Sequence, residues 1–247
     1  TPEILDDTFA GVDGIIIPGG FGSRGTEGMI LAANYARENK IPFLGICLGM
    51  QMAMVAFARN VLGYADANSS ELNPDTTHPV VDLMPDQNGV ENLGGTLRLG
   101  SYPCVLDKKS KAYALYGTDM IQERHRHRFE INNDYRDDFT SHGMMISGQS
   151  PDGHIVEMIE LPEHPFYVGI QAHPEFKSRP NHAHPLFAGF VESAEEQGVL
   201  RRAKKLLMKR NHLSESEAHR YLQKTSMDTG RTMAESAHMV TMLIQED

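Results

Sequence analysis

Residues 45–49 read Gly-Ile-Cys-Leu-Gly and place Cys47 between two glycines, where a predicted strand gives way to a predicted helix. This pattern is typical of a nucleophile elbow, with cysteine in place of serine. A sharp strand-to-helix turn leaves no room for flanking side chains. It also sets the sulfur at a helix N-terminus, where the helix dipole favours the thiolate. Because most lone cysteines are small buried core residues, the pentapeptide alone leaves both interpretations open.

A histidine and a glutamate two residues apart, His173 and Glu175, follow a predicted buried strand over residues 166–171. Residues i and i+2 of a strand point the same way, so the carboxylate is expected to hydrogen-bond the imidazole and hold its tautomer. The other ring nitrogen would then face a thiol. Together with the elbow, this order along the chain predicts Cys47 as nucleophile, His173 as base and Glu175 as orienting acid.

The turn over residues 18–22, Pro-Gly-Gly-Phe-Gly, follows another predicted strand. Attack of a thiolate on an amide forms a tetrahedral oxyanion, which needs two aimed N–H donors. The amide of Leu48, just after the nucleophile, is one candidate, and Gly20 in the turn is the natural second. A phosphate-binding glycine turn is the alternative, but the Walker Lys-Ser/Thr pair and the G-x-G-x-x-G spacing are both lacking.

The elements that must position these residues alternate between strand and helix. Strands are expected over residues 14–17 and 42–46 and helices over 27–39 and 48–61, which favours a parallel α/β sheet. Residues 66–160 change character, and their short segments at 95–99, 123–132 and 155–161 predict antiparallel strands and loops that decorate the core. A helix is expected over 185–196.

The last fifty residues read as three short helices, over residues 199–210, 214–225 and 232–245. Ser214 with Glu217, and Thr232 with Glu235, form two capping boxes. Residues 198–247 carry nine Lys or Arg and six acids, a net charge of +3. Because the whole chain has a net charge of −10, residues 1–197 have a net charge of −13. This switch predicts a boundary between a domain over 1–197 and a small module over 198–247.

Composition limits the classes of protein that need to be considered. Hydrophobic residues make up 40% and charged residues 23%, as in soluble globular proteins. No apolar run approaches the ~18 residues of a membrane span, and nothing at the start resembles a signal peptide. The two cysteines, Cys47 and Cys104, lack zinc-site spacing and the twelve histidines are scattered, so no metal site is expected. A reducing cytoplasm is the expected setting.

Several segments resemble, in order, the glutaminase domain of CTP synthase, a class I glutamine amidotransferase with a flavodoxin-like sheet. They span residues 10–193 and include GIIIPGGFGSRGTEGM, PFLGICLGMQ, ANSSELNPDTTHPV, NLGGTLRLG, ERHRHRFEINN and QAHPEF. The resemblance implies the triad and oxyanion donors given above. It also implies that glutamine is bound. The segment Gly94–Gly100 would be the lid loop through which GTP promotes glutaminase activity. The implied glutamine-binding residues are Gly20, Leu48, Gly49, Met50, Gln51, Glu71 and Arg128.

Arg128, one of these implied glutamine-binding residues, ends the run Arg-His-Arg-His-Arg over residues 124–128. On a strand its arginines would share one face and its histidines the other. Without the resemblance, the run reads as a solvated sheet edge or a nucleic-acid patch.

Two departures from the family are expected to matter. The synthetase domain, which binds ATP, UTP and Mg and would receive the ammonia, is not in this chain. The chain starts at Thr1 close to the first glycine turn, so a fragment lacking the first strand–helix–strand portion is expected. The glutaminase domain itself is expected to need no cofactor, and the full-length protein is expected to be a homo-oligomer.

The second departure is the tail, which resembles an ANTAR domain, the three-helix RNA-binding module of bacterial antitermination regulators. Its basic first helix predicts contact with RNA through Arg201, Arg202, Lys204 and Lys205, although a solvated basic helix remains the alternative. The matching positions are Ala203, Lys204, Leu207, Met208, Ser214, Glu217, Ala218, Leu222, Ser226, Met227 and Ala237.

The sequence therefore predicts glutamine hydrolysis by a Cys-His-Glu triad that serves the amination of UTP to CTP. The alternative is an antitermination-type regulator whose glutaminase-like domain senses glutamine while residues 199–245 bind RNA. An amidotransferase subunit with a different ammonia acceptor is a third interpretation, which the segments GGTLRLG and ERHRHRFE disfavour.

Overall fold

The computed structural model describes residues 2–83 and 98–245, which fall into two compact units, Thr1–Phe190 and Val191–Asp247. Most of the expected lid, residues 94–97 of Gly94–Gly100, lies outside the described residues, as does the start of the strand expected over 95–99. None of the described helices is both long and apolar enough to cross a membrane.

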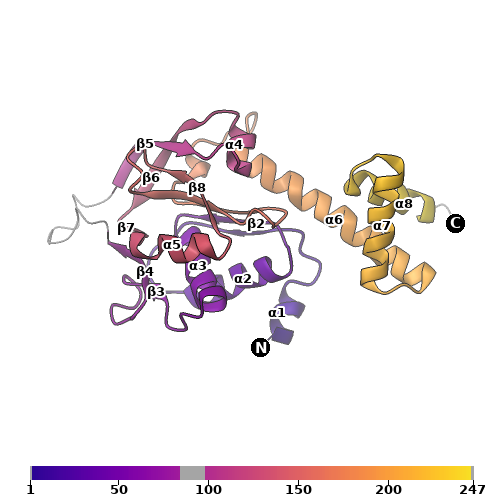
Figure 1. The fold of residues 1–247 in the computed structure, drawn as a ribbon, viewed down its shortest axis with the longest axis horizontal. Coiled ribbons are helices and arrows are strands. Elements are labelled where there is room, and N and C mark those ends of the chain that lie inside the picture. The colour runs from indigo at the N-terminus through magenta and orange to yellow at the C-terminus, as the bar shows by residue number, and fades with distance from the viewer. Residues whose placement is uncertain (1, 84–97, 246–247) are drawn as a thin grey trace. The chain divides into compact units, whose positions relative to one another are not determined.

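The first unit is built on a seven-stranded sheet whose strand order is β1-β2-β10-β9-β8-β5-β6. Figure 1 labels β2, β8, β5 and β6 of this sheet. The first three strands in this order pair in parallel, and every further pairing is antiparallel. The α/β class is confirmed. The antiparallel strands expected to decorate the core instead extend the same sheet, because β9 pairs directly with β10. The bounds are β1 Ile15–Ile17, β2 Phe43–Ile46, β10 Tyr167–Ile170, β9 Val156–Glu160, β8 Met145–Gln149, β5 Arg98–Leu106 and β6 Met120–His127.

A small second sheet joins β3 (Asn68–Ser69), β4 (Pro79–Leu83) and β7 (Phe129–Ile131). The single strand expected over residues 123–132 is therefore two strands in two different sheets. β6 ends at His127, β7 begins at Phe129, and Arg128 is the one residue that joins them. The sequence pattern is continuous across this join, so nothing in it predicted the change of sheet.

Helices cover both faces of the large sheet. On one face α2 (Thr26–Glu38) and α3 (Leu48–Phe57) pack over β1 and β2, in a core that includes Phe43 and Tyr167. On the other face α4 (Lys111–Tyr116) and the first turns of α6 (Pro185–Asn211) cover Leu44, Val168 and Ile170. A π-helical segment, Ala58–Leu62, extends α3. The short helices α1 (Pro2–Thr8) and α5 (Arg136–Ser141) complete the unit.

The second unit contains the end of α6, α7 (Glu215–Thr229) and α8 (Met233–Gln245). Both predicted capping boxes form: the Ser214 and Thr232 amides donate to the carboxylates of Glu217 and Glu235, at 2.8 Å each. The two helices expected over 185–196 and 199–210 are one helix, α6, because a lone Gly198 costs a helix only about 1 kcal/mol. The core of the unit consists of Ala203, Leu207, Ala218, Leu222, Ala237 and Val240.

Candidate active site

Cys47 lies at a strained elbow between β2 and α3. Its backbone has φ 50° and ψ −104°, a left-handed conformation that a non-glycine residue adopts only when its surroundings impose it. The two glycines are required by close approach. A Cβ on Gly49 would lie 2.1 Å from the Ile17 carbonyl oxygen, and one on Gly45 would lie 2.8 Å from the Gly49 carbonyl. The geometry is that of the nucleophile elbow predicted from sequence.

His173 and Glu175 are in contact, as the sequence predicted, but for a different reason. The ring Nδ1 of His173 lies 2.6 Å from Oε1 of Glu175. Both residues lie beyond β10, and Glu175 belongs to a 3-10 turn, Pro174–Phe176, so the turn brings them together rather than strand alternation. The other ring nitrogen, Nε2, is buried and has no hydrogen-bond partner among the described residues.

Gly19 connects the imidazole to the cysteine. A Cβ at this position would lie 2.8 Å from Cε1 of His173 and 3.5 Å from Cβ of Cys47. The His173 ring and the Cys47 side chain therefore both pack against Gly19, whose missing side chain leaves space for them. The sequence pointed to Gly20 in this turn for an N–H donor, but did not predict this role for Gly19.

The Cys47 thiol is protonated at rest. Burial raises its pKa to about 12, and the carboxylates of Glu175 and Glu71 act in the same direction. The amide of Leu48 and the side chain of Gln171 oppose this, but more weakly. The helix N-terminus acts in the predicted direction, because the Leu48 amide lowers the pKa of the thiol, but desolvation of the sulfur outweighs it. A base must take the thiol proton during reaction.

The cysteine opens onto a pocket that holds most of the predicted binding residues. It is lined by Gly20, Phe21, Cys47, Leu48, Gln51, Glu71, His127, Arg128 and Phe129. Gly49 and Met50 do not line it: Gly49 packs on β1, and Met50 is fully buried in the core. Phe21, His127 and Phe129 were not predicted as lining residues. The signal that could have indicated the last two is their position beside Arg128.

Arg128 and Glu71 give this pocket one group of each charge. Nε of Arg128 is buried and has no hydrogen-bond partner among the described residues. Burial raises the pKa of Glu71, while the positive charge of Arg128 acts to lower it. A ligand with an anionic and a cationic group matches this pair.

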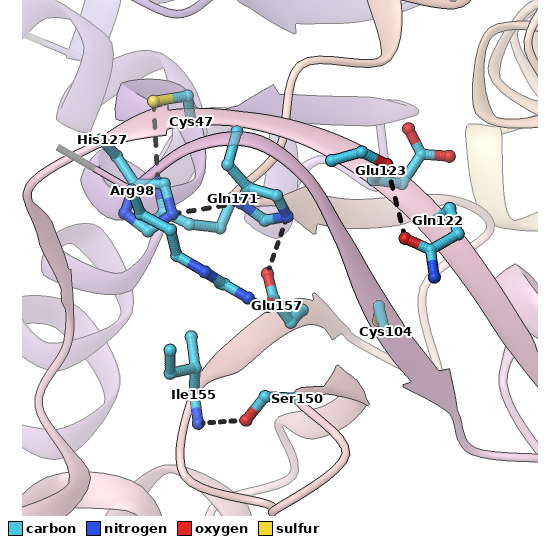
Figure 2. A network of polar contacts seen from close by, with 12 residues as sticks. Cys47, Arg98, Cys104, Gln122, Glu123, His127, Ser150, Ile155, Glu157 and Gln171 are labelled. Atoms are coloured by element: carbon cyan, nitrogen blue, oxygen red, sulfur yellow. Dashed lines mark hydrogen bonds and ion pairs between the residues drawn. The ribbon is translucent and has the colours of Figure 1, made fainter.

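Two buried glutamines connect the floor of the pocket to the thiol. The Gln51 amide donates to the Phe129 carbonyl at 2.9 Å and to Oε1 of Gln171 at 3.2 Å. Gln171 in turn donates to Sγ of Cys47 at 3.6 Å (Figure 2). Gln51 was predicted as a binding residue. Gln171 was missed, because its contact depends on the pairing of β10 with β2.

β6 alternates as the basic run predicted. Arg124 and Arg126 are exposed, whereas His125 and His127 are buried with Glu123 on the inner face. The exposed arginines fit a solvated edge. The buried histidines do not: Nε2 of His125 lies 3.4 Å from Oε2 of Glu157, whose Oε1 accepts from Nη1 of Arg98 at 2.5 Å.

The predicted RNA-binding residues lie on the part of α6 within the second unit. Arg202 and Lys205 are exposed. Lys204 forms an ion pair with Glu215 at 2.6 Å, and Arg201 is half-buried and engaged in a contact. The free positive charge of this helix therefore comes from Arg202 and Lys205, with Lys209 one turn on. No group of metal-ligating side chains occurs in the described part of either unit.

An α/β sheet with a cysteine at a strained elbow, beside a histidine–carboxylate pair, defines the chain as an α/β protein of the nucleophile-elbow class. The chain belongs to the glutamine amidotransferase class-I family, whose model matches residues 1–193. A model of the ANTAR domain matches residues 190–240.

CTP synthases are among the curated relatives of the chain. The chain is 58% identical over 195 residues to that of Clostridium beijerinckii, covering 79% of this chain and 36% of the relative. It is 61% identical over 183 residues to that of Moorella thermoacetica, covering 74% and 34%. Among solved structures, the glutaminase domain of Trypanosoma brucei CTPS with bound acivicin matches with a TM-score of 0.74 and 37% identity, over 78% of this chain and 74% of that one. The chain thus spans about a third of the CTP synthases it matches.

Proposed function

We propose that the first unit hydrolyses glutamine to glutamate and ammonia, with Cys47 as nucleophile, His173 as base and Glu175 as the acid that orients it. The observation that carries the proposal is the strained elbow cysteine, which shares Gly19 with an imidazole held at 2.6 Å by a carboxylate. Family membership and the match to a CTPS glutaminase domain support it.

The protonated thiol determines the first step. Nε2 of His173 removes the Cys47 proton as the sulfur attacks the amide carbon of glutamine, which forms a tetrahedral oxyanion. The backbone amides of Leu48 and Gly20 are the donors proposed to stabilise it. The imidazolium returns its proton to the leaving nitrogen, so ammonia departs and a γ-glutamyl thioester remains. Water, deprotonated by His173, then hydrolyses the thioester to glutamate and restores the thiol.

Substrate recognition follows from the charges of the pocket. Arg128 is proposed to bind the α-carboxylate of glutamine and Glu71 its α-ammonium, and Gln51 lines the same pocket. Gly49 and Met50 contribute by shaping the elbow rather than by contact through side chains.

The ammonia is proposed to serve the amination of UTP to CTP, because the relatives are named CTP synthases. That activity would require a synthetase domain with ATP, UTP and Mg. Activation by GTP would be tested on the assembly of this chain with a synthetase domain. A homo-oligomer is proposed for the assembly. Location in the cytoplasm is also a prediction, favoured by the free thiol that the reaction requires.

RNA binding by the second unit is a second proposed function, carried by the ANTAR match and by the exposed Arg202 and Lys205. Affinity for an RNA hairpin should fall steeply with salt. A double Arg202→Gln, Lys205→Gln variant should weaken binding and reduce the salt slope, while Lys111→Gln, on the first unit, should leave both unchanged. Equal affinity in the double variant and the parent would refute the proposed surface.

The test of the first function is glutamate release from glutamine by the parent chain and by Cys47→Ala. Turnover in the parent and its loss in the variant are expected, with the same circular dichroism spectrum for both. Equal turnover in the two proteins would refute the triad, and a folded parent without turnover would refute hydrolysis by this chain.

A further inference from the structure

A line of buried polar groups runs behind the pocket and plays no part in the proposed hydrolysis. It begins at Glu157 on β9 and continues through His125 and His127 on the inner face of β6, and all three side chains are almost fully buried. Figure 2 labels Glu157 and His127, the first and last of these side chains. It ends at the carbonyl of Phe129, which lines the pocket. Burial of three titratable groups is costly unless they bond to one another.

Three contacts connect the line. Oε2 of Glu157 lies 3.4 Å from Nε2 of His125, and these two buried atoms face each other with no formed hydrogen bond to any of the described residues. Nδ1 of His125 lies 3.1 Å from Nε2 of His127, whose Nδ1 lies 3.1 Å from the Phe129 carbonyl oxygen.

The three contacts need one more hydrogen than the two neutral imidazole rings supply. Each contact requires one hydrogen between its two atoms, so three are needed, and each neutral imidazole carries only one N–H. The Phe129 carbonyl can only accept, so His127 donates from Nδ1 and accepts at Nε2. His125 must then donate from Nδ1, which leaves its Nε2 as a lone pair facing Glu157. A protonated Glu157 carboxyl supplies the missing hydrogen.

We propose that Glu157, as a neutral acid, heads a directed hydrogen-bond line through His125 and His127 that positions Arg128 and Gln51 for glutamine. The inference rests on the proposed function, because it concerns the same pocket. Glu157, His125 and His127 are positioning residues, since none of them is proposed to touch the reacting atoms.

The end of the line explains how it acts on the pocket. The bond from His127 to the Phe129 carbonyl spans Arg128, the one residue that joins β6 to β7. The same carbonyl accepts from Nε2 of Gln51 at 2.9 Å. Losing the line would free the backbone on both sides of Arg128 and remove the fixed acceptor of Gln51.

Ionisation directions support this placement of the proton. Burial raises the pKa of Glu157 to about 7, more than the Arg98 charge lowers it, while Asp152 raises it further. Burial lowers the pKa of His125 to about 2 and that of His127 to about 3, with Arg98 and His173 acting the same way. The rings are therefore neutral and the carboxyl holds the proton below neutrality. The groups facing the line are Arg98, Tyr102 and Cys104 of β5, Asp152, and His173.

A pH-dependent KM for glutamine follows. As Glu157 loses its proton through about pH 7, the carboxylate and the His125 lone pair repel and the line is broken. KM is then expected to rise about tenfold between pH 6 and pH 8, the effect of roughly one hydrogen bond, while kcat changes less.

Glu157→Gln is the decisive variant. Its amide oxygen accepts from Arg98 as Oε1 does now, and its NH₂ donates to Nε2 of His125 at every pH. The low KM of the parent at pH 6 is therefore expected across the whole range. His127→Leu, which removes both of that ring's bonds, should have a high KM at every pH. A KM in Glu157→Gln that still rises as in the parent, or that is high throughout, would overturn the proposal.

A second measurement makes the inference independent of turnover. In the folded chain, ¹³C-carboxyl and ¹⁵N-imidazole NMR should show one carboxyl titrating near pH 7, absent in Glu157→Gln, with both buried rings in the neutral Nδ1–H form. A Glu157 carboxyl that is ionised throughout pH 5–8 would overturn the proposal. A parent without glutaminase activity would refute the proposed function instead, and the NMR result would still locate the proton.

Discussion

At the scale of single residues, Gly19 is the residue against which the His173 ring packs. Gly19→Ala would place a methyl group 2.8 Å from Cε1, closer than real Cβ atoms come, so the ring must move away from the thiol. Displacement of a catalytic group by about 1 Å costs on the order of 10²-fold, and kcat is expected to fall by that much with little change in KM.

The control for this variant is Gly28→Ala in α2, where an added Cβ would meet nothing within 4 Å. It should keep full activity and gain up to about 1 kcal/mol in stability, since alanine favours a helix. A fully active Gly19→Ala enzyme would show that the imidazole does not act from this position.

The reactivity of Cys47 with an alkylating reagent follows from its buried thiol. Because burial raises its pKa to about 12, the thiolate fraction of the free enzyme should increase with every unit of pH over the stable range. The rate of iodoacetamide labelling at Cys47, followed by peptide mass spectrometry, should rise about tenfold per pH unit between pH 6 and pH 9 with no plateau. A plateau near pH 7 would mean that the resting thiol is ionised.

At the scale of elements, the capping box of α7 is a local device with a measurable contribution. Ser214→Ala removes the acceptor for the Glu217 amide and should cost the second unit about 1 kcal/mol of unfolding free energy. Ser214→Asp retains a capping oxygen and should cost much less. Amide hydrogen exchange in the core of that unit would report the difference, and equal protection in the two variants would contradict it.

The capping boxes also show which features the sequence could predict. The capping box of Ser214 with Glu217 and the elbow around Cys47 are determined by residues within a few positions of one another, and both form as expected. The contacts of Gln171 with Cys47 and of Glu157 with His125 join residues far apart in sequence. They exist only because β9 and β10 extend the parallel strands, which no local pattern specified.

Long-range pairing also explains the errors at the scale of elements. The side chains over residues 123–132 alternate between the two faces without interruption, so one strand was expected. The chain nevertheless changes sheets at Arg128, because β6 pairs with β5 in the large sheet whereas β7 pairs with β4 in the small one. The raised pKa of the Cys47 thiol could not be predicted for the same reason. Its helix position is visible in the sequence, but its burial depends on the whole sheet.

At the scale of the whole molecule, two buried glutamates make stability depend on pH in opposite directions. The pKa of Glu157 is raised by burial from an ordinary 4.5 to about 7, so its contribution is fully present below pH 4.5 and is lost as pH rises through 7. The pKa of Glu123 is lowered, because its bonds to His184 at 3.0 Å and Lys177 at 3.1 Å outweigh burial. Its contribution is present above pH 4.5 and is lost as pH falls.

Unfolding free energy should therefore be greatest at mildly acidic pH, near about 5, and fall towards pH 8 by about 3 kcal/mol from Glu157 alone. Urea unfolding followed by circular dichroism from pH 4 to pH 8 would measure this. Glu157→Gln should flatten the alkaline side and Glu123→Gln the acid side, because each amide keeps the shape of the side chain and cannot ionise. An alkaline loss that persists in Glu157→Gln would assign it to another group. The same variant is expected to flatten the pH dependence of KM, so stability and glutamine affinity should respond together to this one buried proton.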